Sequence, residues 1–259
     1  MSQTSSGGAA GQGAAPDTEL YPDLVAAGGL RPALAKAATD LGVDVGELQG
    51  DEAGAGTDTG AGAASGPAAH RQPLVVRLGA EERWFMVSGW SRGVELIRGR
   101  TQDLHEVARA AAAWRSGASL HELHELCPFV TFGELAQAHE RGPADAVAVK
   151  WRLLRESMRA GLPLPAVRDL VEAAYAEPKL RQLYPFTSNR SLHFTTCTGY
   201  PFTWVVPFVD PLQDGRFRVC GPSRRAVIGE ADSAGEAIAL VVRHLPADIG
   251  PAVAGTARD

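Results

Sequence analysis

Helix-start signals are concentrated in the middle third of the chain, and they limit where a sheet can form. Two capping-box patterns occur, SLHE at 119–122 and TFGE at 131–134, in which a hydroxyl and a carboxylate satisfy opposite backbone N–H groups. Four helices are predicted, the last ending near Leu183. Their limits are marked by Pro128, Pro143, Gly161 and Pro165, and the last is bent or broken at Pro178.

Short strand patterns occupy the flanking thirds of the chain. Runs rich in Val, Ile and aromatic residues, separated by Gly-containing turns, predict strands at 73–78, 83–88, 94–98, 191–198, 202–209, 216–221 and 226–230. Each set is followed by a helical pattern, with Thr101 and Ser233 as the expected N-caps. The sequence therefore predicts an α+β fold: antiparallel β-meanders each followed by a helix, with a central helical layer.

The two strand-rich segments resemble each other. FMVSGWSR (85–92) and FRVCGPSR (217–224) agree at Phe, Val, Gly, Ser and Arg, and Thr101 and Ser233 stand at the same offset. Two interpretations stay open, namely two related β-meander/helix modules or a single α+β domain.

Composition divides the chain further. Residues 1–17 lack the apolar surface needed for order, and 51–70 form an Ala/Gly-rich linker. Between them, 18–50 predict a short helical leader broken at Gly28–Gly29, either docked on the body or free for a partner. The body comprises an N-terminal sheet plus helix (71–118), a helical region (119–190) and a C-terminal sheet plus helix (191–259).

Charge and cysteine usage exclude several classes. Residues 1–70 hold nine acidic and two basic residues, while the remainder is almost neutral, so we expect no nucleic-acid partner. No apolar run is long enough to span a bilayer, and the first 16 residues do not resemble a signal peptide. Three cysteines without CxxC spacing fit free thiols. We therefore expect a cytoplasmic protein with no membrane contact, metal or cofactor.

The motifs for familiar chemistry are weak. His121 and His124 have i, i+3 spacing and no evident third ligand, which favours exposed helix histidines over zinc. Residues 119–142 have the length of a helix-turn-helix, but the second helix has few base-reading side chains. His139, Glu140 and Arg141 fit a catalytic acid/base set or a helix C-terminus. No phosphate-binding glycine loop or G-x-S-x-G elbow occurs.

The stretch YPFTSNRSLHFTTCTGYPFTW (184–204) holds the remaining candidates. The two YPFT segments are interpreted as boundaries of the first C-terminal strand. In a regular strand His193 and Cys197 would share a face about 13 Å apart, too far for a dyad, although either can act with a partner from elsewhere. Catalytic candidates are His193, Cys197 and His139. A pocket where sheet meets helices would be lined by Tyr184, Arg190, His193, Tyr200 and Trp204.

Several runs carry a family resemblance. The segments RWFMVSGWSRGVELIRG, AAAAWRSGASLHEL, AHERGPADAV, LRQLYPFTS, FTTCTGYPF and GPAVAGTARD resemble an actinomycete family of unknown function labelled natural product biosynthesis protein, over about residues 72–259. The resemblance implies association with specialised-metabolite gene clusters and assigns no residue a role.

These observations lead to one expectation and two alternatives. We expect an accessory or protein-binding factor of natural product biosynthesis, with a protein partner from the pathway and an oligomeric state that the sequence leaves open. The first alternative is a small-molecule enzyme with its site at the sheet/helix junction near His193. The second is a helix-turn-helix regulator.

Overall fold

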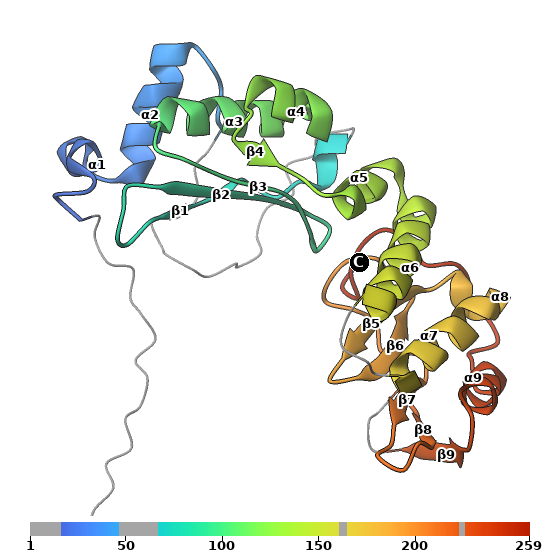
Figure 1. The fold of residues 1–259 in the computed structure, drawn as a ribbon. Coiled ribbons are helices and arrows are strands. Elements are labelled where there is room, and N and C mark those ends of the chain that lie inside the picture. The colour runs from blue at the N-terminus through green and yellow to red at the C-terminus, as the bar shows by residue number, and fades with distance from the viewer. Residues whose placement is uncertain (1–16, 47–66, 161–164, 223–225) are drawn as a thin grey trace, which may run out of the picture. The chain divides into compact units, whose positions relative to one another are not determined.

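The fold is α+β, as the sequence predicts, and is divided into two compact units (Figure 1). The computed structural model describes residues 17–46, 67–160, 165–222 and 226–259. One unit contains Met1–Trp90 and Ile97–Thr131, and the other contains Ser91–Leu96 and Phe132–Asp259. Each unit is described separately. The expected disordered start and most of the Ala/Gly-rich linker lie outside the described residues, as does the stop signal Gly161.

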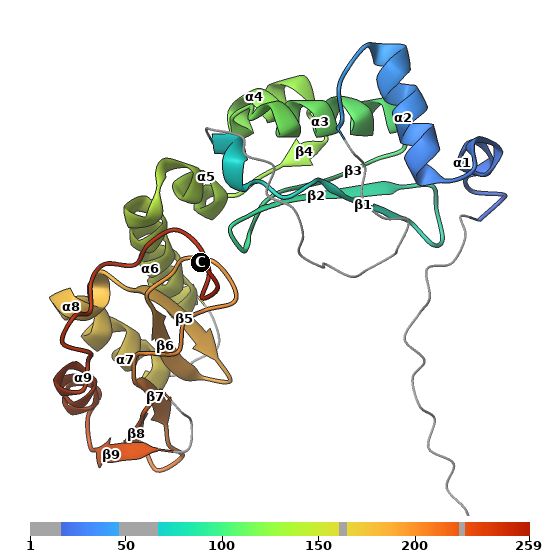
Figure 2. The same ribbon diagram turned by 180° about the vertical axis from the view of Figure 1, so that it is seen from behind.

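The first unit has a four-stranded antiparallel sheet covered on one side by helices (Figures 1 and 2). The strands are ordered β1-β2-β3-β4, and the short η1 (Pro67–His70) precedes them. Their bounds are β1 Val75–Leu78, β2 Phe85–Ser91, β3 Val94–Thr101 and β4 Val130–Thr131. The helices are α1 Pro22–Ala27, α2 Leu30–Leu41, α3 Leu104–Ser116 and α4 Leu120–Leu126.

The leader helices form part of this unit's core. The break at Gly28–Gly29 is confirmed, and both glycines adopt positive φ, which favours glycine. Leu24 and Leu34 pack in one cluster with Phe85 and Val107. The leader is therefore docked on the sheet, which resolves the alternative that the sequence leaves open.

Tyr21 fixes the leader to the β1–β2 turn. The residue is 1% exposed, and its hydroxyl donates to Gly79 O at 2.9 Å and accepts from Trp84 N at 3.1 Å. At the surface above it, Arg83 forms a two-bond ion pair with Asp23, which lowers the pKa of that carboxyl. A side chain 58 residues away thus satisfies the polar groups of a turn.

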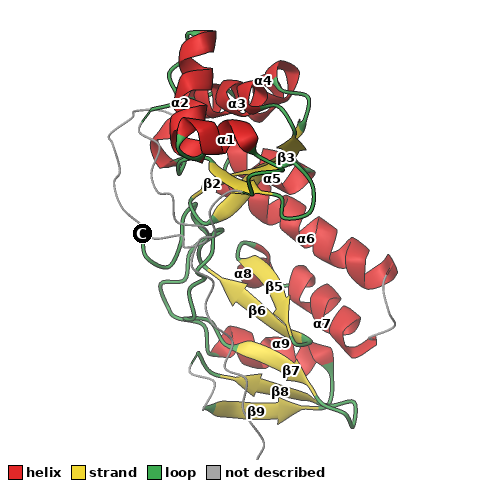
Figure 3. Cartoon of the chain, turned by 90° about the vertical axis from the view of Figure 1, so that its left-hand side faces the viewer, coloured by secondary structure: helices red, strands yellow, loops and turns green. Residues whose placement is uncertain are grey.

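The second unit has a five-stranded antiparallel sheet, ordered β5-β6-β7-β8-β9 (Figure 3). Its strands are β5 Tyr184–Ser188, β6 Ser191–Thr195, β7 Phe208–Pro211, β8 Phe217–Cys220 and β9 Val227–Ala231. Its helices are α5 Glu134–Arg141, α6 Pro143–Ala160, α7 Pro165–Ala176, α8 Pro178–Arg181 and α9 Ala234–Arg243. The break at Pro178 is confirmed by the separation of α7 and α8.

One face of this sheet packs against α6, α7 and α9. Trp151 from α6, Leu170 from α7 and Val241 from α9 are fully buried with Leu192 and Val209. Leu192 and Val209 are paired directly across β6 and β7, so they share this helix-covered face. By strand alternation, His193 and Phe208 lie on the opposite face.

Two predicted N-caps are wrong and two capping residues are confirmed. Thr101 still belongs to β3, and Asp103 caps α3 by accepting from His105 N. Thr131 pairs in β4, so α5 begins after Gly133 without a side-chain cap. Thr131 is retained in the strand by its pairing with Arg98. The capping box of Ser119 and Glu122 is confirmed, and Ser233 caps α9.

The boundaries predicted around 184–209 are also wrong. The first YPFT segment is itself strand β5 rather than a boundary, and β6 ends at Thr195. Residues 196–199 instead pair with the C-terminal segment, through a parallel bridge of Cys197 and Val253 and the bond from Gly199 N to Gly255 O. Because residues 196–199 pair with the C-terminal segment, the predicted hairpin with residues 202–207 does not form. Residues 202–207 are a loop, and β7 begins only at Phe208.

The proposed internal repeat stays a prediction. The orders β2-β3-α3 and β8-β9-α9 match, and Phe85 and Phe217 are both buried. The observed N-caps, Asp103 and Ser233, are however not separated by the same number of residues as the two matched sequences that begin at Phe85 and Phe217.

Replacing Tyr21 with Phe tests the docking of the leader. The variant removes one hydroxyl and leaves the partly buried Trp84 N–H without its acceptor, so we expect the free energy of unfolding, measured by urea titration, to fall by about 1–3 kcal/mol. Tyr200→Phe, an exposed tyrosine, is the control and changes stability by less than about 0.5 kcal/mol. Equal stability of Tyr21→Phe and the wild type would contradict the assigned role.

Candidate functional site

The candidate site is built on the β5–β6 hairpin of the second unit. Ser188 pairs with Ser191, so Asn189 and Arg190 alone form the turn, with φ of 49° and 75°. Two-residue hairpin turns of this kind require positive φ at both positions, which Asn tolerates well. The turn fixes the register and thereby sets Phe186 directly opposite His193.

His193 is enclosed by aromatic rings. Its imidazole stacks on Phe186 with centroids 4.9 Å apart and on Phe208 at 4.5 Å, while the Trp204 ring meets it edge-on at 5.3 Å. Only 3% of the residue is exposed. The imidazole is therefore packed into this face of the sheet, and the three aromatic rings around it shield it from solvent.

Cys197 lies beyond the end of β6. Its Sγ is 3.3 Å from Thr195 Oγ1 and 3.6 Å from Gly199 O, and the residue is buried. Because the strand ends at Thr195, the regular alternation assumed for His193 and Cys197 does not extend to the thiol. Its surroundings are hydroxyl and carbonyl oxygens of its own loop.

A second group of side chains lies at the other end of β5. His139 Nε2 on α5 is 3.4 Å from the Tyr184 hydroxyl, and Lys150 Nζ on α6 lies 5.5 Å from the centre of the Tyr184 ring. Burial, aided by the Lys150 charge, lowers the pKa of His139 from 6.5 to about 4. Burial also lowers the pKa of Lys150 and raises that of Tyr184. The imidazole is thus neutral at physiological pH.

Phe202 connects the two groups. Its ring is 6.0 Å from that of Tyr184 and 4.6 Å from that of Phe186, between centroids. Tyr200 meets Phe202 at nearly a right angle. One continuous row of rings therefore runs from the Tyr184 group to the His193 group.

The loop between β6 and β7 exposes apolar side chains beside this row. Tyr200 is 70% exposed, Trp204 44% and Val205 47%. Thr203 anchors the loop, since its Oγ1 accepts from Thr196 N at 3.0 Å and its N–H donates to Thr195 Oγ1 at 3.1 Å. We call Tyr200, Trp204 and Val205 the loop surface.

The structure brings together five of the seven predicted site residues. Tyr184, His139, His193, Tyr200 and Trp204 belong to the connected rings, whereas Arg190 is exposed in the hairpin turn and Cys197 is buried in its loop. Sequence reasoning missed Lys150, Phe186, Phe202 and Phe208. Lys150 could have been identified from the sequence, because it follows Ala146 by four positions and Val147 by three and so falls on the buried stripe of α6.

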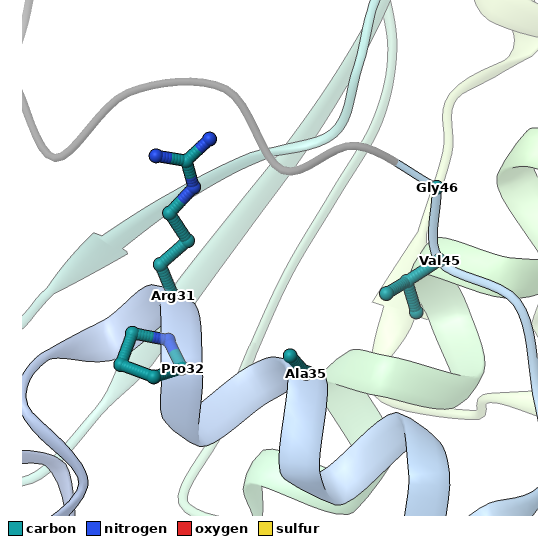
Figure 4. Close-up of a pocket in the computed structure, with 5 residues that line it drawn as sticks. All are labelled: Arg31, Pro32, Ala35, Val45 and Gly46. Carbon is teal, nitrogen blue, oxygen red and sulfur yellow. The ribbon is translucent and has the colours of Figure 1, made fainter.

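Other candidate features have ordinary surroundings. His124 Nδ1 lies 2.7 Å from Val130 O, and no His, Cys, Asp and Glu group among the described residues is arranged to hold a metal ion. An open pocket in the first unit is lined by Arg31, Pro32, Ala35, Val45 and Gly46 (Figure 4). Arg31 is the only ionisable side chain in that lining. None of the helices described has the length and apolarity to cross a membrane.

Comparison with protein families finds a match to the C-terminal part of the chain. Residues 145–256 match a family described as "Family of unknown function (DUF6193)". The matched segment contains Lys150, the β5–β6 hairpin and the loop surface. No curated protein matches the chain, and neither does a solved structure.

Replacing His193 with Ala tests its packing role. The change leaves a space between Phe186 and Phe208, so we expect a loss of about 2–4 kcal/mol in the free energy of unfolding. Thr187→Ala, at an exposed position on the neighbouring strand, should cost less than about 1 kcal/mol. An unchanged stability of His193→Ala would show that the rings do not depend on the imidazole.

The titration of His139 tests its burial. Its folded-state pKa lies below the ordinary value, so the unfolded chain takes up a proton as pH falls below 6.5 while the folded chain does so only near pH 4. Stability from this group is complete above pH 6.5 and is lost as pH falls through about 4.

Proton NMR of the His139 imidazole should accordingly give a midpoint near 4. The variant His139→Gln should lose less stability than the wild type over that pH range. A midpoint near 6.5 for His139 would contradict the burial.

Proposed function

We propose that the protein is an accessory factor of natural product biosynthesis that binds a partner protein through the loop surface. The observation that carries the proposal is the exposure of Tyr200, Trp204 and Val205 on one anchored loop. Tyr and Trp are enriched where protein interfaces bury their central residues.

The composition around the loop surface supports a protein partner. No Asp, Glu, Lys or Arg occurs between Ser191 and Val209, which includes the whole loop. Depletion of charge with enrichment of aromatic residues is typical of an interface centre, whereas nucleic-acid surfaces are rich in Lys and Arg. The complementary surface on the partner is therefore apolar at its centre.

The anchoring of the loop favours binding. Trp204 is held edge-on against His193 and Phe186, and Tyr200 against Phe202. Side chains that are already ordered lose less conformational entropy when a partner covers them. The burial of His193 also supports binding over catalysis at that imidazole, since a general base must reach its substrate.

The pathway context rests on the sequence resemblance. A chain similar to natural product biosynthesis proteins is expected to act beside the enzymes of such a pathway. We therefore propose that the partner is a cytoplasmic enzyme of specialised metabolism.

The double variant Tyr200→Ser, Trp204→Ser tests the interface. The tagged wild type is used to isolate the complex from the native cells, its partner is identified, and binding of the purified partner is measured by calorimetry. Loss of two aromatic interface anchors should weaken binding by at least about 2 kcal/mol, or roughly thirtyfold.

Val227→Ser is the matched control, because Val227 is 59% exposed on β9 of the same unit and lies outside the loop. The control should bind like the wild type. Equal binding by the double variant would contradict the proposed surface, as would self-association of the chain through Tyr200 and Trp204 in place of a second protein.

A further inference from the structure

Lys150 is a cation placed among apolar groups. It lies on the buried stripe of α6, and its side chain is half-buried. The other three cations of this helix are ion-paired: Arg152 with Glu134 and Glu156, and Arg155 and Arg159 with Glu172. Among the residues described, none forms an ion pair with Lys150. Its ammonium group lies over the Tyr184 ring, 5.5 Å from the ring centre.

Two groups beside Lys150, the His139 imidazole and the Tyr184 phenol, are uncharged at neutral pH. Burial keeps the His139 imidazole neutral, since its pKa is about 4, and it keeps the Tyr184 phenol protonated. An ammonium in such surroundings loses hydration without gaining a counter-charge, which lowers its pKa. A lysine desolvated in this way has more free amine near neutral pH, and the free amine is a nucleophile.

We propose that Lys150 is a nucleophilic amine that captures a small aldehyde or ketone as a Schiff base. The reacting side chains, Lys150, His139 and Tyr184, lie on α6, α5 and β5 and are not part of the loop surface. Lysine amines react with carbonyl compounds in this way when their environment favours the neutral form. The adjoining rings of Tyr184 and Phe202 favour a carbonyl compound with an apolar or aromatic substituent.

The neighbouring side chains supply the proton transfers. The Lys150 nitrogen attacks the carbonyl carbon, a C–N bond forms, and the carbonyl oxygen takes a proton, which gives a carbinolamine. The carbinolamine then loses its hydroxyl as water, and a C=N bond forms without any oxidant or reductant. The Tyr184 hydroxyl can donate to the oxygen, and the neutral His139 imidazole can accept the proton that leaves nitrogen.

Reductive trapping tests this inference in the full chain. The protein is incubated with benzaldehyde and sodium cyanoborohydride near pH 7.5, and modified lysines are quantified by peptide mass spectrometry. The chain has only three lysines, and Lys36, with 73% of its side chain exposed, and Lys179, also exposed, serve as internal controls. Each unit by which the pKa of an amine falls raises its free-amine fraction about tenfold.

Because burial lowers the pKa of Lys150, we expect it to be modified several-fold faster than either control lysine. Lys150→Arg retains the charge and removes the primary amine, so it should lose this adduct while Lys36 and Lys179 react as before. His139→Asn and Tyr184→Phe, with folding verified by circular dichroism, should slow the modification of Lys150 only.

Two results would overturn the inference. One is modification of Lys150 no faster than that of Lys36 and Lys179. The other is the absence of an adduct together with stabilisation of the wild type, but not of Lys150→Met, by acetate or inorganic phosphate. The second result would identify an anion-binding lysine in place of a nucleophile.

Discussion

The pairing of Phe186 with His193 across the β5–β6 hairpin is the interaction on which the second unit's candidate site depends. A two-residue turn at Asn189 and Arg190 sets this register, and a shift by one residue would turn every side chain of the hairpin to the other face. With the observed register, Leu192 enters the helix-covered core and His193 meets Phe186 and Phe208. The core and the aromatic row thus follow from the same turn.

The aromatic row gives the two ends of the hairpin different chemistry. At one end, the Trp204 ring packs edge-on against His193 and remains partly exposed to solvent, which is the arrangement that the proposed partner binding uses. At the other end, Tyr184 contacts Lys150 and His139 and places two basic groups in apolar surroundings. Phe202 lies between them, in contact with both Tyr184 and Phe186. The two proposals, partner binding and amine chemistry, therefore rest on different side chains.

Local signals in the sequence predict the fold class well, because capping boxes and prolines act over a few residues. The box at Ser119 and the prolines at 143, 165 and 178 correspond to observed helix limits. Errors occur where a distant segment decides the outcome. Residues 196–199 pair with the C-terminal segment instead of β7, and Thr131 is retained in a strand by Arg98. Neither partner can be identified from the local pattern.

The candidate site was predictable as a location and not as an arrangement. Trp204 does lie beside His193, as the sequence suggests, whereas Tyr184 and Tyr200 connect to it only through Phe202 and Phe186. The enclosure of His193 depends on Phe186 and Phe208, which the hairpin register and the β6–β7 pairing bring to it. The sequence alone places Lys150 on the apolar stripe of α6. Only the folded chain shows that none of the described residues forms an ion pair with it.

Site-specific photo-cross-linking tests the central claim, that the loop surface binds a partner protein, most directly. A photoreactive amino acid is placed at Val205 or at Val227, two exposed valines of the same unit, and the variants are irradiated in the native cells. The account predicts that position 205 forms a cross-link to one defined segment of a biosynthetic enzyme and that position 227 does not. Equal cross-linking at both positions, or none at 205, would contradict it.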